Sequence, residues 1–128
     1  MNRPANIATR PEALTADFMR LAEEHISDVL AGRADKLFHA KDFAARLFVH
    51  PRHLTNTIHE TLGISPCEVM ENRIVEEARR MLRETSMPIA DVAYTFLYSE
   101  PTNFTKFYKN MTGETPMQYR KKCRLEAA

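Results

Sequence analysis

The chain has 128 residues, of which 44% are hydrophobic and 27% are charged, with a formal net charge of +1. These values are ordinary for one globular domain, or one domain plus an appendage. A membrane-spanning segment is not expected, because no apolar run approaches roughly 18 residues. The sequence also gives no sign of a secretory signal or of a disulfide framework. The expected location is therefore the cytoplasm.

Charge is distributed unevenly along the chain. Acidic side chains outnumber basic ones in residues 11–35, whereas basic side chains outnumber acidic ones in residues 101–128. A basic patch is the electrostatic footprint expected for binding a polyanion. The alternative is a solvated surface whose charge happens to be uneven.

The first part of the chain is expected to be a flexible, proline-punctuated arm over residues 1–13, followed by an N-terminal helix within residues 14–35. Phe18, Ala22 and Ile26 recur at helical spacing and form an apolar stripe. Two interpretations remain open: the stripe packs on the rest of the domain, or it serves dimerisation or contact with another regulator.

A repeat with an offset of fifty residues organises the remainder. The stretch HPRHLTNTIHETLGISP, residues 50–66, aligns with EPTNFTKFYKNMTGETP, residues 100–116, so that prolines and glycines coincide. Before the turn the offset is forty-nine, because Ala44 aligns with Ala93. Each copy predicts two short helices joined by a turn, and then a capped helix.

The predicted elements are therefore a first helix-turn-helix at about 40–61, a linker helix at about 66–84, a second helix-turn-helix at about 88–111 and a final helix at about 116–123. Ser99 is predicted to cap the second helix of the second motif. The fold class is all-α, with two helix-turn-helix subdomains joined by a long linker helix and an extra N-terminal helix.

The linker helix suggests how the two motifs would be used. Nineteen residues at 1.5 Å rise give about 28 Å, and successive major-groove faces of B-DNA lie about 34 Å apart. One monomer is therefore expected to reach two adjacent grooves. Its site should be asymmetric, because the two copies differ at the exposed positions.

The segment at 36–124 resembles the DNA-binding domain of the AraC/XylS family of bacterial transcription regulators. The resemblance is carried by HPRHLTNTIHETLGISP, ENRIVEEARRML, PIADVA and SEPTNFTKFYKNMTGETPMQYR. It implies seven helices, operator binding and RNA polymerase as a candidate partner. The chain departs from the family pattern at Phe48 and Leu97, where glycine is usual in each turn, and at His50, where serine is usual. It has no room for the separate effector domain of most relatives, so a stand-alone DNA-binding domain is expected.

The resemblance also implies site residues. Those that match base-contacting positions are Arg52, Thr55, Asn56, Pro101, Thr102, Thr105 and Lys106. Phosphate contacts are predicted for His59, Asn103, Lys109, Arg120 and Lys121. The competing interpretation is that these are ordinary solvated side chains.

Other classes of function have weaker signals. His50 and His53 could suggest a metal pair, but neither cysteine nor carboxylate completes a set with ligand spacing. Cys67 could be a reactive thiol, although an inert side chain is the simpler interpretation. An interaction adaptor that lost DNA binding is the main alternative. No catalytic residue, metal ligand or cofactor is predicted.

Overall fold

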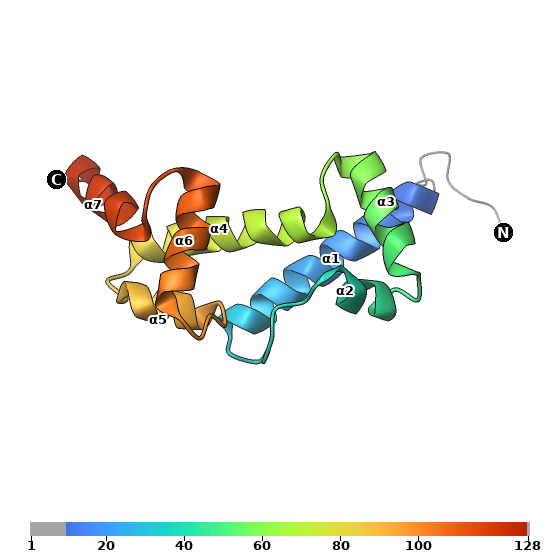
Figure 1. The fold of residues 1–128 in the computed structure, drawn as a ribbon, viewed down its shortest axis with the longest axis horizontal. Helices are drawn as coiled ribbons and strands as arrows, with labels where there is room; N and C mark the ends of the chain where they lie inside the picture. Colours follow the sequence, from blue (N-terminus) through green and yellow to red (C-terminus); the bar gives the residue numbers. More distant parts are fainter. Residues whose placement is uncertain (1–9, 128) are drawn as a thin grey trace. The chain divides into compact units, whose positions relative to one another are not determined.

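The computed structural model describes residues 10–127, which fold into seven α-helices without a β-strand (Figure 1). The predicted all-α fold class is confirmed. The helices are α1 Arg10–Leu30, α2 Ala40–Arg46, α3 Pro51–Leu62, α4 Pro66–Glu84, α5 Ile89–Thr95, α6 Pro101–Thr112 and α7 Pro116–Ala127.

The described chain forms two compact units, each containing one helix-turn-helix. The first unit comprises residues 10–25 and 38–70, and the second comprises residues 26–37 and 71–127. The boundaries fall inside α1 and inside α4. The α2–α3 motif therefore belongs to the first unit, and the α5–α6 motif to the second.

Aromatic side chains of α1, of α2 and of the segment just before α2 build the core of the first unit. Phe18 meets Phe43 edge-on, with ring centroids 5.2 Å apart. His25 is buried, stacks on Phe38 at 3.7 Å, and its Nε2 accepts a hydrogen bond of 3.0 Å from the Phe38 amide. The apolar stripe of α1 therefore packs on the chain itself, which was the first of the two interpretations.

The start of α1 corrects the sequence analysis. Residues 10–13 were assigned to a flexible arm, but α1 already begins at Arg10; residues 1–9 of that arm lie outside the described part. Pro11 and Glu12 suit the first turn of a helix, where a missing amide and a negative charge are both tolerated. One turn later, the Thr15 and Thr61 hydroxyls are 2.7 Å apart, so α3 holds this end of α1 in place.

The turns of both helix-turn-helix motifs have the same backbone conformation. Phe48 has φ 57° and Leu97 has φ 67°, the two positive values among the non-glycine residues described. The amide of the next residue donates a hydrogen bond across the turn. The Val49 amide donates to the Ala44 carbonyl, and the Tyr98 amide donates to the Ala93 carbonyl, each at 3.1 Å. This geometry is the left-handed helix ending that usually takes glycine, so the sequence alignment located both turns correctly.

A buried arginine closes the second unit. Arg120 is 5% exposed. Its guanidinium donates hydrogen bonds to three backbone carbonyls: Leu82 at 3.0 Å, Thr85 at 3.2 Å and Met87 at 2.6 Å. These carbonyls lie at the end of α4 and just beyond it, where helix geometry leaves acceptors without partners. Burial lowers the pKa of the Arg120 guanidinium, and the nearby charge of Arg124 acts in the same direction.

The prediction that Arg120 contacts a DNA phosphate is therefore wrong. Its donors are directed at backbone carbonyls inside the domain. The surrounding helix also differs from the prediction, because α7 continues to Ala127 instead of ending at about residue 123.

Among the described residues, no helix has both the length and the apolar character needed to cross a bilayer.

Replacing Arg120 by alanine should destabilise the domain by at least about 2 kcal/mol, because three carbonyls lose their donor in a buried position. Urea unfolding followed by circular dichroism would measure the change. Lys121→Ala is the matched control: this neighbour is exposed, and its removal should change stability by less than about 0.5 kcal/mol. Equal losses in the two variants would contradict the role assigned to Arg120.

Candidate nucleic-acid interface

The second helix of the first motif, α3, is closed at both ends by its own sequence. Pro51 occupies the first position, and His50 is the N-cap, with its Nδ1 accepting a 3.0 Å hydrogen bond from the Arg52 amide. At the other end Gly63 adopts φ 78° and donates to the His59 carbonyl at 2.9 Å. The imidazole of His50 thus supplies the N-cap acceptor that the sequence comparison expected from a serine at this position.

One face of α3 is buried and the opposite face is polar. Leu54, Thr57 and Ile58 form the buried face. The polar face carries Arg52, Thr55, Asn56 and His59, spaced by three, one and three residues, so they line one stripe of a helix. Arg52, Asn56 and His59 are exposed, and Thr55 is half-buried. We call this set the α3 stripe.

The second motif repeats the arrangement on α6. Phe104 and Tyr108 form the buried face. The polar face carries Thr102, Thr105, Lys106 and Lys109, each fifty residues after its α3 counterpart. Thr105 is half-buried and the other three are exposed. We call this set the α6 stripe.

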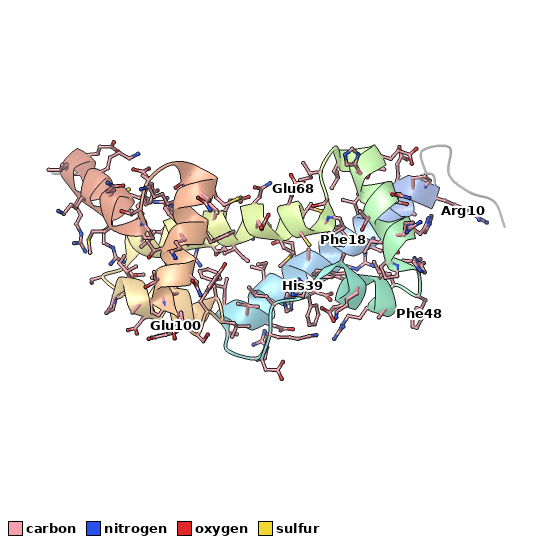
Figure 2. The ribbon with its side chains drawn as sticks, in the orientation of Figure 1. Arg10, Phe18, His39, Phe48, Glu68 and Glu100 are labelled. Atoms are coloured by element: carbon pink, nitrogen blue, oxygen red, sulfur yellow. The ribbon has the colours of Figure 1, made fainter. Side chains whose placement is uncertain are left out.

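The start of α6 differs from the prediction. The N-cap is Glu100, labelled in Figure 2, and no side chain accepts a capping hydrogen bond there. Ser99, predicted as the cap, lies one residue too early, because Pro101 takes the first helical position and the cap is the residue directly before it. Pro101 itself is half-buried, and Asn103 is exposed beside the α6 stripe.

The two stripes differ in charge. The α3 stripe offers one arginine, an amide and an imidazole, whereas the α6 stripe offers two lysines and two hydroxyls. Guanidinium and amide groups can bond base edges in pairs, whereas lysine acts as a point charge. The structure therefore brings the four predicted residues of each stripe together on one helical face, whereas Pro101 and Asn103 lie beside the α6 stripe.

The predicted contacts on α7 separate into two kinds. Lys121 is exposed, as a phosphate contact requires, whereas Arg120 is buried. Arg120 was missed as a structural residue, although the sequence held a signal. It lies four residues after the buried Pro116, and this spacing places both on the same face of a helix.

A cleft of about 280 Å³ lies behind α3, away from its stripe. It is lined by Arg10, Pro11, Leu14, Val49, His53 and Thr57. His53 therefore faces α1 here and does not join the α3 stripe. Within residues 10–127, no cluster of histidine, cysteine and carboxylate side chains could hold a metal ion.

The chain matches the family model of a helix-turn-helix domain over residues 43–122. An arabinose operon regulatory protein from Escherichia coli strain K12 is 30% identical over 105 residues, which are 82% of this chain and 35% of that protein. The chain thus spans roughly a third of this relative.

Two solved structures share the fold. The C-terminal domain of AraT, a response regulator from Geobacillus stearothermophilus, superposes with a TM-score of 0.76 at 24% identity, covering 89% of this chain and 88% of that one. The DNA-binding domain of AdpA, a global transcriptional factor solved in complex with a target DNA, gives a TM-score of 0.72 at 18% identity, covering 88% and 94%.

Replacing His50 by alanine should cost about 1 kcal/mol of stability, because the first turn of α3 loses the acceptor for its Arg52 amide. Replacing His50 by serine should retain most of the wild-type stability, since serine is a good N-cap. Thermal unfolding of the three proteins measures the difference. If the alanine and serine variants melt together below the wild type, the cap is not what His50 contributes.

Proposed function

Since the chain belongs to the AraC/XylS family of helix-turn-helix proteins, we propose that it binds operator DNA sequence-specifically and regulates transcription, with α3 and α6 as its two reading helices. One observation carries the proposal. Two helices on one chain present polar stripes at positions that correspond with an offset of fifty residues, each backed by a buried apolar face. In a helix-turn-helix the second helix enters the major groove.

The α3 stripe has the donors for direct readout. Arg52 can bond the O6 and N7 atoms of guanine as a pair, and Asn56 can bond the N6 and N7 edge of adenine. The methyl group of Thr55 suits a thymine methyl. Arg52 and Asn56 are exposed on adjacent turns of α3, so both can reach base edges of one groove segment.

The second reader is assigned to the start of α6. Thr102, Thr105 and Lys106 are its proposed base contacts, and the half-buried Pro101 offers an apolar edge beside them. Lysine favours the acceptor atoms of guanine. Because these groups differ from those of α3, the two halves of the operator should have different sequences.

Phosphate contacts are proposed for exposed side chains at the margins of the two readers. They are His59, Asn103, Lys109 and Lys121. Such contacts fix the register of a protein on DNA without reading sequence, and they make affinity fall with salt.

We propose that the chain binds as a monomer. The apolar stripe of α1 is used within the chain, since Phe18, Ala22, Ile26 and Val29 are at most 2% exposed, so it offers no surface for a dimer. The nineteen residues of α4 measure about 28 Å, comparable to the 34 Å between successive major-groove faces. The similarity to the arabinose operon regulatory protein of Escherichia coli supports action on a bacterial operon, and hence in the cytoplasm.

Footprinting on fragments selected from random DNA tests the proposal. Two protected major-groove segments should appear on one face of the duplex, about 10 bp apart between centres. The selected sequence should be asymmetric. A palindromic footprint whose protection requires a dimer, or no protection of any selected fragment, would refute the proposal.

Readers and phosphate contacts should respond differently to substitution. Arg52→Ala should weaken the selected site by about 1–3 kcal/mol and relax preference at one base position, while Lys106→Ala should act in the other half of the site. Lys109→Ala should weaken all sequences alike and flatten the salt slope by about one unit. Mobility-shift titrations over a salt series measure these effects. A Lys109 loss confined to the selected site would mean that this lysine reads sequence.

A further inference from the structure

Phe48 occupies its turn in a way that folding does not explain. Its φ of 57° is one that L side chains other than those of asparagine and aspartate rarely adopt, and glycine adopts it without strain. Its side chain is 94% exposed. Figure 2 shows it at the turn between α2 and α3. An aromatic residue here thus carries backbone strain and exposed apolar surface together.

The second motif provides the comparison. Leu97 has the same backbone conformation, with φ 67°, but its side chain is half-buried. Packing of the Leu97 side chain within the second unit therefore offsets part of the backbone strain at this residue. Phe48 has no comparable packing against residues 10–127, since its side chain is 94% exposed. Strained residues that packing does not repay are typically found at functional sites.

The surface around Phe48 is cationic. Residues 43–59 contain no aspartate or glutamate. Their charged side chains are two exposed arginines, Arg46 and Arg52. An exposed aromatic ring in a segment whose charged side chains are both arginines suits a polyanion that also offers apolar groups. Duplex DNA meets both requirements, since its backbone is anionic and each thymine exposes a methyl group in the major groove.

The position of Phe48 in the motif specifies the contact. The turn leads directly into α3, and the N-terminal residues of a recognition helix are those that face base edges. Phe48 precedes Arg52 by four residues. We propose that Phe48 is a DNA-contacting residue whose ring packs on the C5-methyl group of a thymine at the edge of the segment read by α3. This inference rests on the proposed function, which it deepens by adding an apolar contact from the turn.

The test combines three Phe48 variants with DNA in which each thymine of the selected site is replaced, one at a time, by uracil, which lacks only the methyl group. At one position, uracil should weaken binding of the wild-type protein about 4-fold, as expected for the loss of one buried methyl group. Phe48→Gly and Phe48→Ala should weaken binding to the thymine site by about the same factor and lose the sensitivity to uracil there. Phe48→Leu should keep part of the sensitivity to uracil, because leucine retains an apolar side chain at the turn.

Stability measurements separate contact from folding. Phe48→Gly should melt no lower than the wild type, because glycine relieves the strain and an exposed ring is all that is removed. Phe48→Ala keeps the strain, so equal losses of affinity in both variants point to the ring. Leu97→Gly is the matched control in the other turn and should leave the sensitivity at that thymine unchanged.

Two outcomes overturn the inference, and they are distinguishable. If the wild type binds DNA and Phe48→Gly binds thymine and uracil sites as the wild type does, the ring does not contact DNA and an acidic protein partner becomes the better explanation. If the wild type binds no duplex, the proposed function fails and this inference fails with it.

Discussion

Each helix-turn-helix depends on one residue in the left-handed conformation. That residue follows the end of the first helix and redirects the chain, so that the second helix starts three residues after Phe48 or four after Leu97, with its apolar face buried. Placing phenylalanine or leucine there costs of the order of 1–3 kcal/mol relative to an unstrained turn. Packing offsets part of this cost at the half-buried Leu97 but not at the exposed Phe48. Equivalent amide-to-carbonyl hydrogen bonds, donated by Val49 and by Tyr98, close the two turns.

Charge serves two separate purposes in this chain. Arg120 is buried and holds the carbonyls at the end of α4, so its charge stabilises backbone geometry in the second unit. The exposed lysines and arginines of the stripes have no such internal role. The net charge therefore does not distinguish the buried, structural Arg120 from the exposed cations. Only the exposed cations are available to a polyanion.

The two copies of the motif share the proline and glycine residues that shape the backbone of the second helix, and they differ in their polar stripes. Pro51 and Pro101 begin the reading helices, and Gly63 and Gly113 end them in the left-handed conformation. Between these limits the stripes differ at three of their four positions, Thr55 and Thr105 being the shared pair. The same scaffold can thus present different hydrogen-bonding groups to the two halves of one DNA site.

Features that depend on neighbouring residues were predictable from the sequence. The linker helix was expected at residues 66–84 and is Pro66–Glu84, because its cap, proline and apolar period are local signals. Both left-handed positions, Phe48 and Leu97, were also located, by the resemblance to a family pattern that has glycine there. The assignment of the stripes to DNA contact remains a prediction, although the sequence did place each set on one helical face. Tertiary structure decided the rest. Arg120 looks like a surface cation until the end of α4 and the residues after it supply carbonyls from some thirty-five residues away, and only the folded chain brings the Thr15 hydroxyl of α1 against the Thr61 hydroxyl of α3. Such pairings join groups far apart in the chain, so no local pattern of charge or hydrophobicity encodes them.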